Sequence, residues 1–125
     1  MTGIEWLIEA FGCADARLSD QAQLLELFET IIGRMELRPI GKPVWHVFPD
    51  SGGVTGVWLL QESHLAIHTW PEAGFVAVDV YVCNYTTDNS DKADRVFRAL
   101  QAVLKPQRSR FQAIRRGGKD DGKES

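Results

Sequence analysis

The sequence predicts an α+β fold, a two-layer sandwich in which two helices cover one face of a mostly antiparallel sheet. Two segments carry apolar residues at helical spacing, whereas the other apolar segments are short and extended. Their order is strand, helix, several strands, helix, strand, which is typical of helices gathered on one face of a sheet. A chain of 125 residues is long enough for one hydrophobic core.

The first predicted strand is the mainly apolar segment 4–11. The helix after it is expected to begin near Asp20, a suitable N-cap, and Gln23 at the third helical position could complete a capping box. Apolar residues then form one helical stripe, which consists of Leu24, Leu25, Phe28, Ile31, Ile32 and Met35. The next extended segment, 38–48, contains two prolines, which confine it to a sheet edge or an irregular strand.

Three strands are predicted in the middle of the chain. A turn at 51–53 leads into strands 54–61 and 64–70, which a sharp connection joins. A second turn at 71–73 leads into strand 74–83. Along this last strand every second residue shares one face, and the face that ends in a cysteine also carries an aspartate, unlike a plain core.

The second helix is expected to begin at residue 90 or 91 and to stop before Pro106. Its apolar stripe consists of Val96, Phe97, Leu100, Val103 and Leu104. A final strand is predicted over residues 109–115. The sheet face that both helices leave open is expected to carry side chains such as Trp58 and Trp70.

Composition narrows the class of protein. Residues 1–116 are expected to form a single domain, and the polar, glycine-rich tail 117–125 is expected to be disordered. The formal net charge of -3 and the pI near 5.6 argue against nucleic-acid or anionic-membrane partners. The sequence has no apolar run long enough to span a bilayer, and we expect no secretory leader. Cys13 and Cys83 do not make a disulfide framework, so we expect a cytoplasmic protein with reduced thiols, Cys13 being structural.

The segment 62–72, Glu-Ser-His-Leu-Ala-Ile-His-Thr-Trp-Pro-Glu, is unusually dense in functional groups. Burying histidines and carboxylates in a strand costs free energy unless each is paired, so folding alone does not explain it. His64 and His68 could share a metal ion on a helix. On a strand their four-residue separation is roughly 13 Å, so no metal site is expected, and His64 is interpreted as structural.

This run, followed by an alternating strand that ends at Cys83, resembles the short prokaryotic form of the self-cleaving, pyruvoyl-dependent S-adenosylmethionine decarboxylases. The resemblance implies cleavage between Glu62 and Ser63 into fragments 1–62 and 63–116 plus tail. Ser63 would become a pyruvoyl group that binds the substrate amine as a Schiff base, with no need for pyridoxal phosphate or a metal. The family also implies a homodimer that packs through the helix-free sheet face.

The resemblance further implies a role for each site residue. His68 is the processing base, and Cys83 is the acid that protonates the product carbon. Thr55 stands where the family usually has a serine whose hydroxyl assists processing. The substrate pocket would consist of Phe48 and Trp70, which sandwich the adenine, and Glu72, which binds the ribose hydroxyls. The product would be the aminopropyl donor for polyamine synthesis.

Several positions depart from the family pattern and leave alternatives open. Asn84, Ala73, Phe75 and the loop 85–89 are atypical, and the same chemistry could act on ornithine or arginine. The threonine in place of serine suggests a second alternative, a non-processing homologue that acts as a binding or regulatory partner. A serine hydrolase is a weak third option because the Gly-X-Ser-X-Gly elbow is missing.

Overall fold

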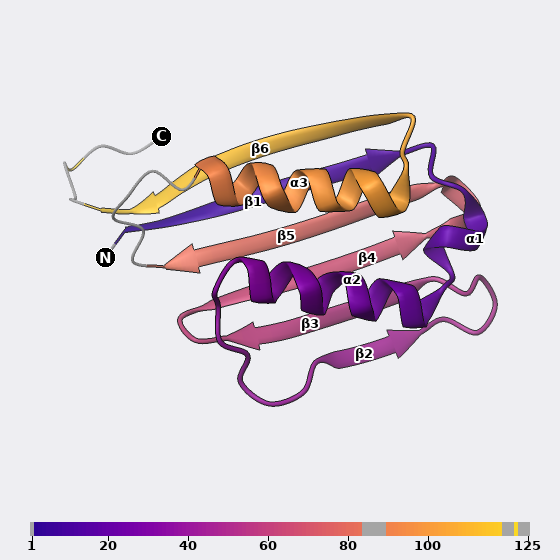
Figure 1. Ribbon diagram of the computed structural model, residues 1–125, viewed down its shortest axis with the longest axis horizontal. Coiled ribbons are helices and arrows are strands. Elements are labelled where there is room, and N and C mark those ends of the chain that lie inside the picture. Colours follow the sequence, from indigo (N-terminus) through magenta and orange to yellow (C-terminus); the bar gives the residue numbers. More distant parts are fainter. Residues whose placement is uncertain (1, 84–89, 119–121, 123–125) are drawn as a thin grey trace.

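The computed structural model describes residues 2–83, 90–118 and 122. Six strands form one sheet in the order β2-β3-β4-β5-β1-β6, and all neighbouring pairs are antiparallel (Figure 1). The strands are β1 (Thr2–Phe11), β2 (Val44–Val47), β3 (Val54–Leu60), β4 (Ser63–Trp70), β5 (Phe75–Cys83) and β6 (Arg108–Gly117). The helices are α1 (Asp15–Leu18), α2 (Gln21–Arg34) and α3 (Ser90–Leu104), and Pro71–Ala73 is a short 3-10 turn, η1.

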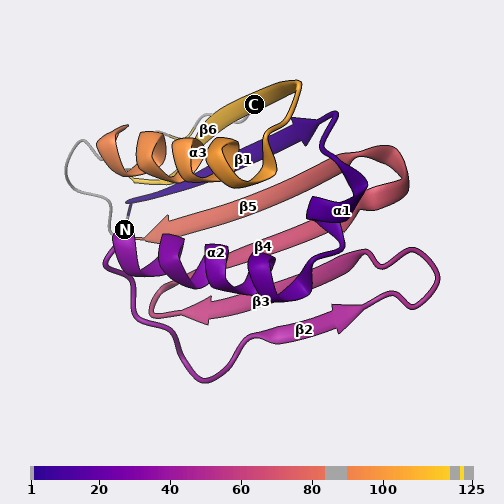
Figure 2. The same ribbon diagram turned by 45° about the vertical axis from the view of Figure 1, so that its right-hand side comes forward.

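The two long helices lie on the same side of the sheet. Figures 1 and 2 show α2 in front of the β3–β4 half and α3 in front of the β1–β5–β6 half. The predicted two-layer α+β sandwich is therefore confirmed. None of the helices in the described part of the chain has the length and apolar character needed to span a bilayer.

Local signals account for the helix ends. The Asp20 carboxylate accepts a hydrogen bond of 3.1 Å from the backbone N–H of Gln23, which is one half of the predicted capping box. The helix α3 ends two residues before Pro106, which cannot continue it. The four-residue helix α1 was not predicted, because so short a segment carries no helical period.

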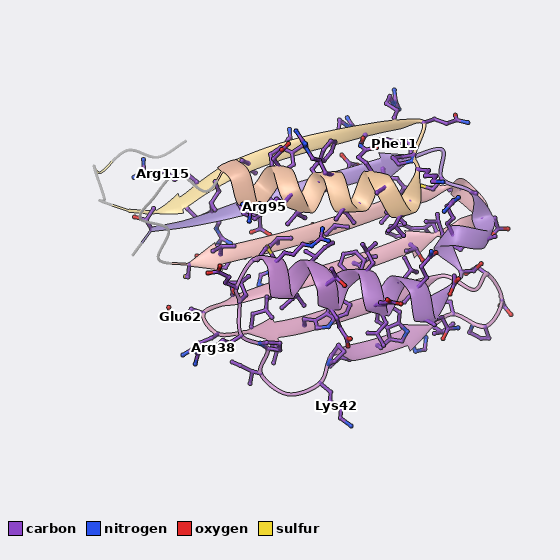
Figure 3. All side chains as sticks on the ribbon, in the orientation of Figure 1. Phe11, Arg38, Lys42, Glu62, Arg95 and Arg115 are labelled. Carbon is purple, nitrogen blue, oxygen red and sulfur yellow. The ribbon has the colours of Figure 1, made fainter. Side chains whose placement is uncertain are left out.

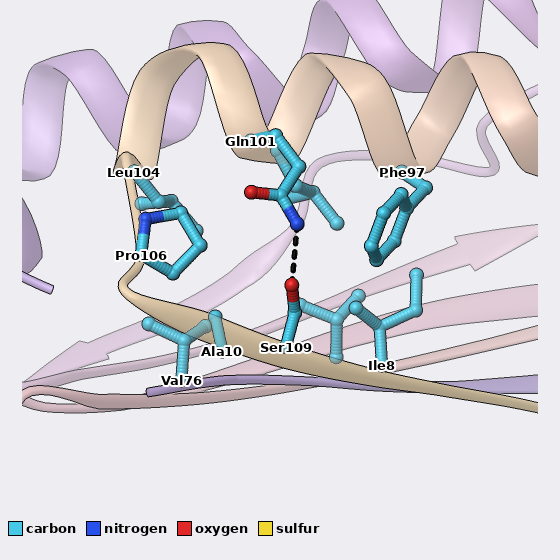
Figure 4. A pocket seen from close by; sticks show the side chains of 10 residues that line it. Ile8, Ala10, Val76, Phe97, Gln101, Leu104, Pro106 and Ser109 are labelled. Carbon is cyan, nitrogen blue, oxygen red and sulfur yellow. Dashed lines mark hydrogen bonds between the residues drawn. The ribbon is translucent and has the colours of Figure 1, made fainter. Parts of the chain in front are cut away.

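The core lies between the helices and one face of the sheet. Buried residues alternate along the central strands, as expected for strands covered on one side. The side chains that meet there include Trp6 and Ile8 of β1, Leu65 and Ile67 of β4, Val76, Val78 and Val80 of β5, Phe28 and Ile31 of α2, and Leu100 and Leu104 of α3. Figure 4 shows the underside of α3, where the Gln101 amide donates a hydrogen bond to the Ser109 hydroxyl of β6.

The expectation that Trp58 lies on the helix-free face is wrong. Trp58 is 2% exposed and packs in the core against Phe28 of α2, with ring centroids 5.6 Å apart. Val54 and Leu60, which share its face of β3, are also buried. Trp70 does lie on the open face and is 41% exposed.

Thr69 is the polar side chain most deeply placed among the described residues and ties α1 to the sheet. Its Oγ1 accepts from the Val54 N–H at 2.9 Å and its hydroxyl donates to the Leu18 carbonyl at 3.1 Å. The residue is 4% exposed, so the Val54 N–H and the Leu18 carbonyl both rely on its hydroxyl as a hydrogen-bond partner.

We predict that Thr69→Val lowers the free energy of unfolding by about 2–4 kcal/mol, because it leaves a buried N–H and a buried carbonyl unpaired. Urea unfolding at a fixed protein concentration measures this change. Thr69→Ser keeps the hydroxyl and is the matched control, with a smaller expected loss. Equal midpoints for the valine variant and the parent would contradict the assignment.

Candidate active site

The residues singled out in the sequence lie mainly on the sheet face opposite the helices. Along β4 this face carries His64, Ala66, His68 and Trp70, and along β5 it carries Phe75, Ala77, Asp79, Tyr81 and Cys83. The antiparallel register fixes how they meet, because it pairs Thr55 with His68 and His64 with Tyr81. The expected common face of the β5 residues is confirmed.

Thr55 and His68 are in direct contact across β3 and β4. The distance between Thr55 Oγ1 and His68 Nδ1 is 3.1 Å, and the tautomer of the imidazole decides which group donates. When Nδ1 accepts from the hydroxyl, Nε2 carries the ring proton, and when Nδ1 donates, Nε2 is free to act as a base. The Thr55 hydroxyl can serve either tautomer, because it can both donate and accept a hydrogen bond.

A pocket opens beside this pair. It is lined by Phe48, Pro49, Asp50, Ser51, Thr55, His68, Thr69, Trp70 and Glu72, and its volume is about 350 Å³. A site of this size is within the range of small-molecule pockets. Phe48, Trp70 and Glu72, to which the resemblance assigns substrate binding, all line this one pocket. The pocket also contains Asp50, a second carboxylate that no pattern in the sequence indicated.

The indole of Trp70 is supported from behind by a column of rings. Phe75 stacks on it with ring centroids 5.3 Å apart, and Phe11 packs on Phe75 at 5.2 Å. The guanidinium groups of Arg108 and Arg110 lie 4.7 Å and 5.2 Å from the Phe11 ring. Phe75, noted in the sequence only as a departure from the family, therefore holds one wall of the pocket.

Ser63 begins β4 directly after a two-residue connection. The strands pair up to Leu60 and Ser63, which leaves only Gln61 and Glu62 to make the turn. Glu62 has φ 60°, a left-handed conformation that costs a residue with a side chain about 1–2 kcal/mol. The Ser63 hydroxyl points back to the Gln61 carbonyl at 3.5 Å. The expected sharp connection is present, and it is strained at Glu62.

Cys83 ends β5 at the same end of the sheet as this hairpin. The His64–Tyr81 pair is the last between β4 and β5, so Cys83 and Ser63 both lie beyond it. The thiol of Cys83 donates a hydrogen bond of 3.5 Å to the Tyr81 hydroxyl. This bond, followed by burial, raises the pKa of Tyr81 above its ordinary value, so the phenol is protonated at neutral pH.

The structure does not bring Ser63 and His68 together within one chain. Five residues of strand separate them, which is roughly 16 Å. The Ser63–Cys83 group therefore lies at one end of β4 and β5, and the pocket with His68 lies at the other. Figure 3 labels Glu62 at the first end and Phe11, whose ring column backs the pocket, near the opposite end.

The other expectations from the sequence concern metal binding, His64, Cys13 and the segment that begins at Asn84. In the described ranges no group of three His, Cys, Asp or Glu side chains could hold a metal ion. His64 packs its ring on Tyr81 at 5.8 Å. Cys13 is buried, and burial raises the pKa of its thiol. Asn84 and the loop 85–89 lie outside the described residues.

The domain is an α+β sandwich whose antiparallel sheet has helices on one face and presents hydroxyl, imidazole and thiol groups on the other. Comparison with known proteins gives its family. A model described as S-adenosylmethionine decarboxylase matches residues 4–117. The chain belongs to the S-adenosylmethionine decarboxylase family.

Individual relatives agree with this assignment. The chain is similar to the S-adenosylmethionine decarboxylase proenzyme of Parasynechococcus marenigrum, with 36% identity over 116 residues, 93% of this chain and 86% of that protein. It is 30% identical to the proenzyme of Archaeoglobus fulgidus over 117 residues, 94% of this chain and 99% of that one. The crystal structure of the adenosylmethionine decarboxylase from Aquifex aeolicus superposes with a TM-score of 0.79 at 32% identity, covering 98% and 97% of the two chains.

The left-handed conformation at Glu62 yields a stability prediction. In a Ser63→Ala background, Glu62→Gly should raise the free energy of unfolding by about 0.5–1 kcal/mol, because glycine adopts positive φ without a steric cost. Glu36, with φ 57°, is the matched control, and Glu36→Gly should give a similar gain. Destabilisation by Glu62→Gly alone, measured by urea unfolding, would contradict a strained turn.

Proposed function

We propose that this protein is a self-processing, pyruvoyl-dependent decarboxylase that acts on S-adenosylmethionine and supplies the aminopropyl donor for polyamine synthesis. The observation that carries the proposal is the position of Ser63 in a strained two-residue hairpin, with the Cys83 thiol at the same end of the sheet. Membership of the S-adenosylmethionine decarboxylase family and the proenzyme names of its relatives support it.

The proposed processing needs only side chains of this protein and water. The Ser63 hydroxyl attacks the Glu62 carbonyl carbon, the C–N bond breaks, and the amide becomes an ester. A base then removes the Ser63 α-proton. The bond between Ser63 Cβ and Oγ breaks, and Glu62 leaves as a carboxylate that keeps this oxygen. The remaining dehydroalanine takes up water and releases ammonia to leave a pyruvoyl ketone. Because the amide-to-ester step is uphill, strain at Glu62 favours it.

The residues at the hairpin fit such a group. A pyruvoyl ketone, once formed, supplies an electron sink for decarboxylation. Cys83 lies at the same end of the sheet and can hold a proton on Sγ for the substrate carbon that has lost carbon dioxide. The free thiols of Cys13 and Cys83 are consistent with a reducing, cytoplasmic location, which we propose for the protein.

His68 cannot act on Ser63 of its own chain at a distance of roughly 16 Å along the strand. We therefore propose a homodimer in which His68 and Thr55 of one copy serve Ser63 of the other. Between the two clusters, the open face presents apolar side chains that a second copy would cover, namely Leu7, Val57, Leu59, Ala66 and Ala77. Leu59 is 58% exposed in the single chain. An isologous two-fold contact would complete both sites at once.

The pocket chemistry supports a nucleoside that carries a cation. Phe48 and Trp70 are 46% and 41% exposed and offer two ring faces for an adenine. Glu72 can accept two ribose hydroxyls, and the carboxylate of Asp50 adds attraction for a sulfonium. The same two carboxylates would also attract the distal charge of ornithine or arginine, which is the second candidate. Thr55 keeps its hydroxyl on His68, so this substitution gives no support to a non-processing homologue.

The first functional prediction concerns cleavage. Wild-type protein should yield two fragments, the second lacking the mass of one ammonia relative to simple hydrolysis, and Ser63→Ala should stay whole. His68→Ala should also stay whole on its own. Co-expressed with Ser63→Ala, the His68→Ala chains should be cut, because the heterodimer holds one complete site.

Intact mass spectrometry of differently tagged chains distinguishes these cases. The double variant Ser63→Ala/His68→Ala is the matched control and should not rescue cleavage of His68→Ala chains. Failure of Ser63→Ala to rescue cleavage of the His68→Ala chains would contradict the shared site. A wild-type chain that remains at full mass would overturn the proposed processing itself.

The second functional prediction concerns the substrate. Glu72→Gln should lower kcat/KM for S-adenosylmethionine by about 10–100-fold, because two charge-assisted hydrogen bonds weaken. Asp50→Asn, which removes the neighbouring carboxylate of the same pocket, should have a smaller effect. Carbon dioxide release from S-adenosylmethionine, ornithine and arginine is measured in parallel with processed enzyme. Activity confined to the amino acids would exclude the nucleoside assignment.

A further inference from the structure

The hydroxyl of Tyr81 is the hydrogen-bond partner of the Cys83 thiol. The two side chains are two residues apart on the open face of β5, and Cys83 Sγ–H donates to Tyr81 Oη at 3.5 Å. Tyr81 was not singled out by the sequence, since a tyrosine in a strand is ordinary. Its hydrogen bond with Cys83, the proposed proton donor, lets it influence how the thiol transfers its proton.

The Tyr81 ring is held by groups from three other strands of the sheet. Arg116 of β6 lies over it at 5.2 Å, and that guanidinium is itself bound to Glu5 of β1 at 3.3 Å. His64 of β4 packs its ring on Tyr81 at 5.8 Å. Gly3 of β1 leaves the space for the phenol, because a Cβ at that position would lie 2.5 Å from Oη. These contacts fix the hydroxyl where the thiol meets it.

A hydroxyl in this position can serve both protonation states of the thiol. While sulfur carries its proton, S–H donates to Oη, as observed. After the proton leaves, the phenol O–H can rotate and donate to the thiolate. The Cys83 contact, followed by burial, raises the pKa of Tyr81, which keeps its O–H available as a donor. The charged and titratable groups around the pair are Arg116, Glu5, His64 and, on the same strand, Asp79.

We propose that Tyr81 is a positioning residue for Cys83, which orients the thiol proton and then stabilises the thiolate that proton transfer leaves behind. The proposal rests on the proposed function, in which Cys83 protonates the decarboxylated carbon. In this proposal Cys83 transfers the proton to the substrate carbon, and Tyr81 acts only through the sulfur of Cys83. It takes no part in self-cleavage.

The test is Tyr81→Phe, which removes one hydroxyl and keeps the ring. The variant should cleave itself at the wild-type rate. Its kcat should fall about fivefold to tenfold with KM within about twofold, the size expected for the loss of one ordinary hydrogen bond. The basic limb of kcat against pH should move up by about 0.5–1 unit, because the thiolate loses its donor. A purely structural change would not shift this limb.

A second readout does not need turnover. The pH midpoint for alkylation of Cys83 by iodoacetamide, followed by peptide mass spectrometry, should rise by the same about 0.5–1 unit in Tyr81→Phe. Cys13 is buried and sits in a different peptide, so it reports on unfolding. In a Cys83→Ala background, adding Tyr81→Phe should cause no further loss of kcat, since the two residues act as one unit.

The outcomes distinguish a failure of the proposed function from a failure of the role of Tyr81. A wild-type chain that fails to cleave or to release carbon dioxide refutes the proposed function, while the alkylation midpoint still tests the contact. An unchanged midpoint together with an unchanged kcat in Tyr81→Phe overturns the role of Tyr81. Gly3→Ala, which displaces the phenol, should reproduce the shift, and a thermal melt checks that this variant is folded.

Discussion

The register between β3, β4 and β5 is the constraint on which the site depends. The two-residue turn at Gln61 and Glu62 leaves β4 one way to pair with β3, and that pairing sets Thr55 against His68. A slip of one residue would turn every β4 side chain to the other face. His68 and Trp70 would then enter the apolar core under α2, and Leu65 and Ile67 would face solvent. The free energy of core burial therefore also holds the reactive groups in place.

The same register divides those groups between the two ends of the sheet. A strand of eight residues is long compared with any hydrogen bond, so Ser63 and His68 at its two ends cannot meet. The apolar side chains between them belong to a face that the helices leave open. In the proposed dimer a single contact would bury this middle region and bring opposite ends of two sheets together. Assembly and catalysis would then share one surface.

Alternation predicted the faces correctly where polar and apolar residues alternate, as from Phe75 to Cys83. It failed at Trp58 because β3 is apolar on both sides: Leu59 and Leu60 are equally suited to a core, yet one is exposed and the other buried. The choice of face comes from the rings of Phe28 and Trp45, which pack on Trp58 from α2 and β2. Such partners, remote in sequence, cannot be inferred from the strand alone.

The contributions of Asp50, Phe75 and Tyr81 were missed for the same reason, since each is defined by a neighbour across the sheet or the pocket. The separation of Ser63 from His68 is different, because the sequence already contained it. Five residues of strand imply a distance of roughly 16 Å. This distance, together with the expected two-stranded hairpin, is itself an argument that the processing serine and its base come from different copies of the chain.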